Sequence, residues 1–269
     1  MVSSKVSRVS DVQALLADGS WRLDDTGAAV FRLAPDSAAR RRELVEQLGA
    51  DPSDAEQWES VLIEALLTDP ATAGLRELEL HLTDYHHSAR RAAEAIATVP
   101  RDRLTSLTFG HDFTYLYAPA TTSTGAKFDP LDRLHEGFVH DSRNGLWEAL
   151  PALRTLTVGG ALLFDDIRSD TLTSLTVRGV PLSDGSLVPT AAPALESLRL
   201  DVPTDVFGVA CPVLQLEELT PSRFPRLRRL DLSRCDFDTS DGEVDEILRA
   251  TGMAGQLTAL ALPGDPALR

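Results

Sequence analysis

The pentapeptide LTSLT occurs twice in the chain, at Leu104–Thr108 and again at Leu172–Thr176. Both copies belong to a six-residue pattern: leucine, two variable residues, a second leucine, one variable residue and an apolar residue. The pattern begins at Leu75, Leu104, Leu153, Leu172, Leu195, Leu227 and Leu257. These starts are separated by 29, 49, 19, 23, 32 and 30 residues. Because the second leucine is present in all seven matches, the pattern predicts an internal structural repeat.

Each match predicts one short β-strand. The second leucine and the apolar residue after it alternate with other residues, and a period of two is typical of a strand. A strand this short cannot bury its apolar face alone, so we expect the strands to stack side by side and in parallel. The threonines and serines between the leucines favour strands and can project their hydroxyls from the sheet.

The repeats resemble leucine-rich repeats of the ribonuclease-inhibitor-like kind, with irregular bacterial repeats, over Leu75 to Leu262. The best single match is LRRLDLSRCDF at Leu227–Phe237, which places Cys235 where this family favours asparagine or cysteine. The resemblance implies an α/β fold, a curved leucine-rich repeat solenoid. Parallel β-strands would line its concave face, and helices and irregular returns its convex face.

The domain organisation follows from where the repeats begin. Residues 75–269 are expected to form a solenoid of about seven repeats with an insertion at about 110–150, and residues 1–74 an N-terminal cap region. An open stack of repeats exposes apolar surface at its first repeat and needs such a cap; a separate small domain is the alternative. Trp21–Leu33 predicts two strands around a DDTG turn, the second of them beside Leu75–Leu80.

Helices are predicted where the pattern changes to a helical period. The segment Asp54–Thr68 places apolar residues on one face. These are Trp58, Val61, Leu62, Ala65 and Leu66. Ser88–Val99 predicts a helix capped by Ser88, and Ser240 with Glu243 matches a capping box at the start of another.

Repeat length predicts the structure of the other returns. Spacings of 19 and 23 residues leave no room for a full helix and favour an extended or short 3₁₀ return, whereas the longer spacings favour helices. In the insertion, Leu131–Leu150 is expected to be helical, with Leu134, Phe138 and Trp147 as packing residues.

Composition limits the classes of function. The chain has 269 residues, 43% hydrophobic and 25% charged, and a formal net charge of −15 at pH 7. Such an acidic surface repels phosphate backbones and anionic lipids, so nucleic acid and membrane are not expected as partners. The N-terminus has no apolar signal stretch and no window has eighteen consecutive apolar residues, which favours a cytoplasmic protein. The preference for arginine over lysine indicates a bacterium with a GC-rich genome.

Sequence motifs give little support to catalysis. The chain has no GxSxG, P-loop or GxGxxG motif, so it is interpreted as a non-enzyme with no cofactor. The six histidines lack metal-ligand spacing, and solvated histidines are the better interpretation. The acidic stretch Asp236–Glu246 departs from a calcium loop, and the start of a helix explains it better. Cys211 and Cys235 form neither a CxxC motif nor a disulfide framework.

Two surfaces are candidates for partner binding. The first is a rim formed by loops after the first two repeat strands, and it carries all three tyrosines. Its residues are Tyr85, His111, Phe113, Tyr115 and Tyr117. Tyrosine is enriched at binding hot spots, although these side chains could equally pack the insertion onto the solenoid.

The second candidate surface is the charged end of the concave face. It carries Arg178, Arg199, Arg228, Arg229 and Asp231. Solvated cross-strand ion pairs are the alternative interpretation there.

The sequence thus favours a non-catalytic protein-protein interaction module or scaffold. It would bind an unidentified protein partner, for example one encoded nearby, through the concave face and one rim. The first alternative is a structural subunit that forms a homo-oligomer through its C-terminal edge. The other is an enzyme with an unrecognised rim site among His86, His87, His111 and Asp112.

Overall fold

The computed structural model of the chain describes ten stretches of residues. They are residues 19–32, 55–82, 90–111, 121–127, 138–140, 145–163, 167–181, 188–204, 208 and 210–264.

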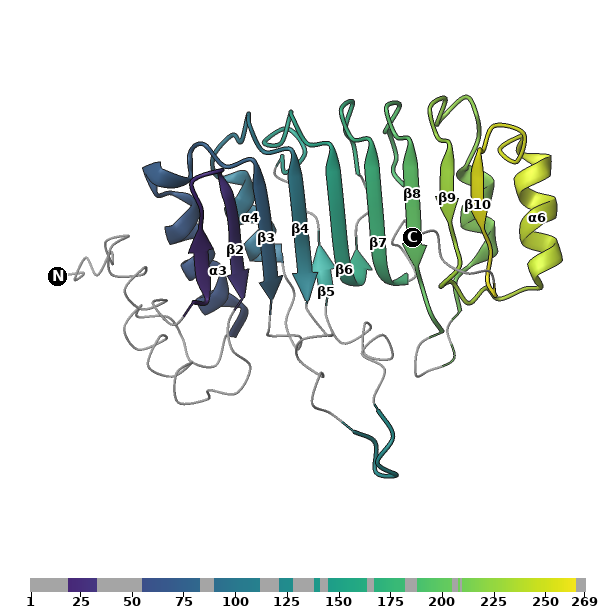
Figure 1. Ribbon diagram of the computed structural model, residues 1–269, viewed down its shortest axis with the longest axis horizontal. Coiled ribbons are helices and arrows are strands. Elements are labelled where there is room, and N and C mark those ends of the chain that lie inside the picture. The colour runs from purple at the N-terminus through teal and green to yellow at the C-terminus, as the bar shows by residue number, and fades with distance from the viewer. Residues whose placement is uncertain are drawn as a thin grey trace.

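Ten strands within these stretches form one sheet, so the fold is α/β with a mostly parallel sheet (Figure 1). The strands are β1 Trp21–Leu23, β2 Ala28–Arg32, β3 Glu77–Leu82, β4 Ser106–His111, β5 Phe138–His140, β6 Thr155–Leu163, β7 Ser174–Pro181, β8 Ser197–Asp201, β9 Arg229–Asp231 and β10 Ala259–Ala261. They follow one another in chain order across the sheet, except that β5 pairs with β6 off the main path. Only β1 and β2 pair antiparallel. This order is compatible with a curved, solenoid-like arrangement.

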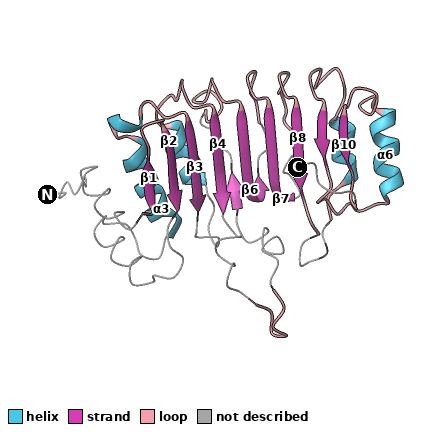
Figure 2. Ribbon diagram, in the orientation of Figure 1, coloured by secondary structure: helices cyan, strands magenta, loops and turns pink. Residues whose placement is uncertain are grey.

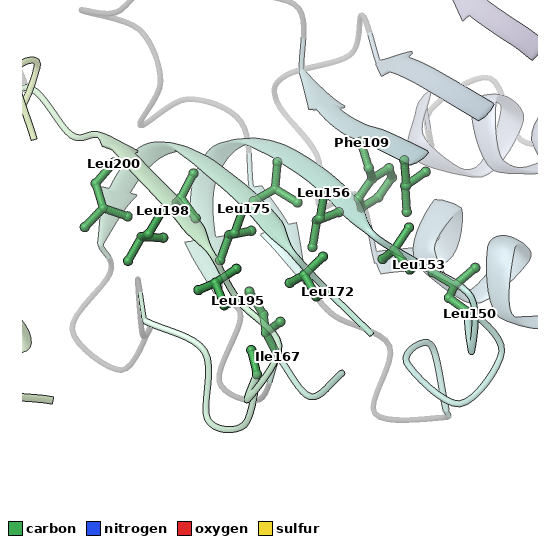
Figure 3. Packing of buried hydrophobic residues seen from close by; sticks show 14 of the residues in the cluster. Phe109, Leu150, Leu153, Leu156, Ile167, Leu172, Leu175, Leu195, Leu198 and Leu200 are labelled. Carbon is green, nitrogen blue, oxygen red and sulfur yellow. The ribbon is translucent and has the colours of Figure 1, made fainter. Parts of the chain in front are cut away.

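The repeat pattern predicted the strands and their register correctly. The second leucine of every match is paired with its counterpart in the next strand. The paired series is Leu78, Leu107, Leu156, Leu175, Leu198, Leu230 and Leu260. All but the last are fully buried, and they interlock with the leucines that open each match, as Figure 3 shows for Leu153, Leu172 and Leu195. Full burial of a leucine side chain contributes about 2 kcal/mol to folding.

The first threonine of LTSLT has the same structural role in both copies. Thr105 donates its backbone N–H and its hydroxyl to the carbonyl of Arg76, at 2.8 and 3.1 Å. Thr173 makes the same two bonds to the carbonyl of Arg154, at 2.8 and 3.1 Å. The first threonine of each copy therefore extends the hydrogen-bond ladder before the strand, and its hydroxyl adds a second bond to the same carbonyl.

The N-terminal strands were also predicted correctly. The β1–β2 turn is held by Asp24, whose Oδ1 accepts the backbone N–H groups of Thr26 and Ala28 at 2.9 Å. These bonds lower the pKa of Asp24, and the bond from Ala28 has the largest effect. Strand β2 pairs in parallel with β3, so it belongs to the same sheet as the repeats.

Helix α3, Ala55–Leu67, confirms the predicted helix and packs against α4, Arg90–Ala97. Its buried face includes Leu62 and Leu66, as predicted, and also Ile63 and Leu67, which the prediction missed. The end of α3 and the 3₁₀ helix η1, Pro70–Thr72, are bonded to the buried Arg101. Its guanidinium donates to the carbonyls of Leu67 and Thr72. Burial lowers the pKa of this guanidinium.

Repeat length predicted most of the returns. Helix α4 and helix α6, Asp241–Ala250, occupy the 29- and 30-residue repeats. The described parts of the 19- and 23-residue repeats contain no helix, and Figure 2 places the helices toward the two ends of the sheet. The 32-residue repeat was predicted to be helical, but its described residues hold only the 3₁₀ helix η3, Val213–Glu218. Proline at 212 and 221 limits this return to a short turn of helix.

Two other local predictions were wrong. The insertion is not helical throughout Leu131–Leu150, because Phe138–His140 forms strand β5. Strand β6 continues beyond its pairing with β4, and β5 pairs with that extension at Ala161–Leu163. Trp147 does pack against the core, as predicted.

The capping box is not formed either. Ser240 is the N-cap of α6, but its side chain makes no capping bond, and Glu243 accepts a bond from Thr239 instead.

The close contact between Gly110 and Gly159 gives a first prediction. Gly110 has a φ of +144°, and a Cβ there would lie 2.1 Å from the carbonyl oxygen of Gly159. We expect Gly110→Ala to lower the free energy of unfolding by about 2 kcal/mol or more, because the added methyl group would overlap the backbone of Gly159. Gly159→Ala is the matched control, since its Cβ would meet its nearest neighbour at 3.7 Å. Urea denaturation of both variants measures these losses. Equal losses would contradict the close contact between Gly110 and the backbone of Gly159.

The last repeat gives a second prediction. Leu227 is completely buried, whereas its counterpart Leu257 is partly exposed beside the terminal strand β10. Leu227→Ala should cost about 2–5 kcal/mol of unfolding free energy, because it leaves a cavity, and Leu257→Ala clearly less. Thermal and urea melts of the two variants compare these costs. A larger loss for Leu257→Ala would show that the terminal repeat is as well packed as the interior ones.

Candidate functional site

The sheet has one face that is turned away from the leucine core, and we call it the open face. Two rows of alternate residues run across it. The first row is Ala28, Glu77, Ser106, Thr155, Ser174, Ser197, Arg229 and Ala259. The second row is Val30, Glu79, Thr108, Thr157, Thr176, Arg199, Asp231 and Ala261.

Chemical character changes along the open face. Glu77 and Glu79 on β3 are exposed acids, and the Glu79 carboxylate lies 2.8 Å from the Nε2 atom of His81. The strands in the middle carry hydroxyls in both rows. The strands β7–β9 carry arginine and aspartate. From β3 to β9 the face is therefore first acidic, then neutral and polar, and then carries guanidinium groups.

The charged end is built around one buried carboxylate. Asp201 has a relative exposure of 1% and lies at the end of β8. Its Oδ1 accepts the Nε–H of Arg199 at 2.7 Å, and its Oδ2 accepts that of Arg178 at 3.2 Å. Arg199 also lies 3.6 Å from the Asp231 carboxylate, through Nη1. We call these four residues the arginine cluster.

The pairings are what make the burial of Asp201 tolerable. A buried carboxylate is strongly unfavourable unless it is paired and hydrogen-bonded, and Asp201 has a guanidinium on each oxygen. The hydrogen bond with Asp201 is also the main cause that raises the pKa of Arg199, so this guanidinium stays charged. The cluster thus holds two arginines in fixed positions on the open face.

Asp231 is fixed by its own turn. Its Oδ1 accepts the backbone N–H of Ser233 at 3.0 Å and the Ser233 hydroxyl at 2.6 Å. The other oxygen, Oδ2, is left to face Arg199. Both carboxylates of the cluster are therefore engaged by groups within the chain.

Two guanidinium groups remain accessible at this end. The Arg178 side chain is 49% exposed and is bonded only through Nε among the described residues, so its Nη atoms have no bond there. Arg229 on β9 is exposed and makes no ion pair within the described part of the chain. A guanidinium presents a planar fork of donors that suits carboxylates.

Buried thiols support the strand that carries Asp201. The Cys235 thiol donates to the carbonyl of Leu200 at 3.0 Å, so the residue next to Asp201 is bonded to the following turn. The hydrogen bond with the Cys211 thiol, together with burial, raises the pKa of Cys235 far above its usual range. Both cysteines are free and buried. A neutral buried thiol is a structural residue and a poor nucleophile.

The structure brings only part of the predicted site together. Arg178, Arg199 and Asp231 meet in the arginine cluster, and Arg229 stands beside it in the first row. Sequence reasoning missed Asp201, although its place two residues after Arg199 on the same strand puts both on one face.

Most of the predicted rim lies outside the residues that the structure describes. Tyr85, Phe113, Tyr115 and Tyr117 lie outside the described residues. His111, at the end of β4, is only 6% exposed. The rim as a contact surface stays a prediction.

Two carboxylates of the acidic stretch Asp236–Glu246 have a structural role. In the acidic stretch, Asp236 accepts the backbone N–H of Thr204 at 2.9 Å, and Asp238 accepts that of Val213 at 3.0 Å.

No group of three or more His, Cys, Asp or Glu that could hold a metal ion occurs within the described stretches. No helix in them is long and apolar enough to cross a membrane.

Comparison with protein-family models, with curated proteins and with solved structures finds no match to this chain. The site is therefore interpreted from its geometry.

The buried carboxylate gives a third prediction. Asp201→Asn removes the charge that both arginines share, and we expect it to lower the free energy of unfolding by about 3 kcal/mol. Asp245→Asn is the matched control, because Asp245 pairs with Arg249 one turn along the surface of α6, and loss of such a pair costs about 0.5 kcal/mol. Urea denaturation at pH 7 measures both losses. A cost for Asp201→Asn as small as that of the control would show that the cluster is not structural.

Proposed function

We propose that this protein is a non-catalytic interaction module of the leucine-rich repeat kind, a curved solenoid that binds a protein partner in the cytoplasm through the open face. The arginine cluster is the observation that supports this proposal most strongly. Three neighbouring strands contribute charged residues to it, and Asp201 holds two of the guanidiniums in place. Fixed polar groups on a rigid sheet lose little entropy on binding, which favours their use in recognition.

The remaining features of the open face fit the same function. The core leucines are on the other face, so residues of the two rows are not needed for packing and can differ from repeat to repeat. From β3 to β9 the side chains of the two rows are small hydroxyls or charged groups, which suits a polar protein surface rather than an apolar ligand. The chain's net charge of −15 favours a partner with a basic overall surface.

A homo-oligomer is the second candidate, and the terminal repeat favours it. Leu257, Leu260 and Leu262 are only partly buried, whereas Leu227, Leu230 and Leu232 in the repeat before are fully buried. A second copy that covered the β10 edge would remove these leucines from water.

A capture experiment tests the proposed function. The tagged wild-type protein and the Arg229→Glu variant are incubated with a lysate of the source organism, and retained proteins are identified by mass spectrometry. Arg229 is exposed and unpaired among the described residues, so its reversal should leave the fold intact. We expect a partner that the wild type retains and the variant retains about tenfold less, which corresponds to about 1.4 kcal/mol.

Two controls make this experiment decisive. Arg249→Glu makes the same charge change on α6 and should retain the partner, and thermal melts should show both variants folded. Light scattering over a range of concentrations measures self-association. If the wild type retains no partner and its mass rises with concentration to that of a dimer, the homo-oligomer replaces the interaction module as the proposed function. Equal retention by wild type and Arg229→Glu would move the contact away from this end of the face.

A further inference from the structure

Between β3 and β9 the first row of the open face is polar throughout, with an acid at one end of this part and an arginine at the other. From β3 to β9 its residues are Glu77, Ser106, Thr155, Ser174, Ser197 and Arg229. The two end residues are exposed, and neither has an ion-pair partner among the described residues. The four residues between them carry hydroxyls. We call this series the polar track.

The ends of the polar track are unmatched because the neighbouring charges are already paired. The Asp201 carboxylate is occupied by Arg178 and Arg199. Asp231 is occupied by Ser233 and faces Arg199. Arg229 therefore remains as a guanidinium that no carboxylate of the described chain neutralises. On β3, Glu79 faces His81, and Glu77 remains as the corresponding acid.

The length of the track sets the length of its occupant. Neighbouring strands are about 4.8 Å apart, so the five steps from β3 to β9 span about 24 Å. An extended chain advances about 3.3 Å per residue and covers that distance in about seven residues. Hydroxyls act as donors and as acceptors, so the middle of the track can bond to the backbone of such a chain without selecting its sequence.

We propose that the open face takes an extended segment of the partner protein that lies along the polar track. The segment carries a lysine or arginine at one end, against Glu77, and an aspartate or glutamate about seven residues away, against Arg229. This proposal rests on the proposed function and adds the chemistry of the partner. The charge complementarity at both ends fixes the direction of the segment, because the reverse placement puts like charges together.

Peptide selection on the intact protein tests the proposal. The probe is a displayed library of random ten-residue peptides, selected on immobilised full-length wild type in low salt. We expect enriched peptides to share a basic and an acidic residue about seven positions apart. A selected peptide should bind about tenfold more weakly to Glu77→Lys and to Arg229→Glu, and added salt should weaken it further. Arg249→Glu should bind it as the wild type does.

A charge swap separates recognition from damage to the fold. The double variant Glu77→Lys/Arg229→Glu should bind the same peptide with its acidic and basic residues exchanged, at about the wild-type affinity. A library that yields no peptide above the bare matrix would overturn the proposal, as would peptides that bind both single variants equally well. If the lysate partner is nevertheless retained by the wild type, the proposed function stands and only the extended-segment inference fails.

Discussion

The in-register stacking of the second leucines is the constraint on which the rest of the structure depends. Each strand is too short to bury its own leucine, and Leu156, Leu175 and Leu198 become fully buried only because their neighbours align with them. A shift of one residue would turn every leucine to the open face. The backbone ladder that includes Thr105 and Thr173 has the same register before the strands start. Backbone bonds and apolar packing thus select the same alignment.

This register also determines which polar residues become neighbours. Once the leucines align, the residues between them form rows across the open face, and residues far apart in the chain come together. Arg178 and Asp201 are 23 residues apart in sequence and share an ion pair across one strand step. The arginine cluster is consequently a result of the repeat, and its rigidity comes from the core beneath it. The proposed function uses that property, since a rigid face can hold charges in place for a partner.

Features set by the period of the sequence could be predicted, whereas those set by side-chain geometry could not. The strands, both polar rows and the helices α3, α4 and α6 follow from the spacing of apolar residues. Strand β5 was not predictable in that way, because it exists only where β6 continues past β4. Ser240 was correctly placed at a helix start, yet a bond from Thr239 to Glu243 replaced the capping box. For the site, sequence alternation placed Arg199 and Asp231 on one face, but the burial of Asp201 between Arg178 and Arg199 depends on side-chain packing in the folded sheet and was missed.

Native-state hydrogen exchange of the whole chain tests the central claim most directly, because it reports on the stacked ladder residue by residue. The account predicts that amides of the strands from β3 to β9 exchange slowly and through a shared opening, with protection that falls at β10. Separate exchange of individual strands at rates close to those of an unfolded chain would contradict it. In that case neither the leucine stack nor the arrangement of charges on the open face could be the stable state of the molecule.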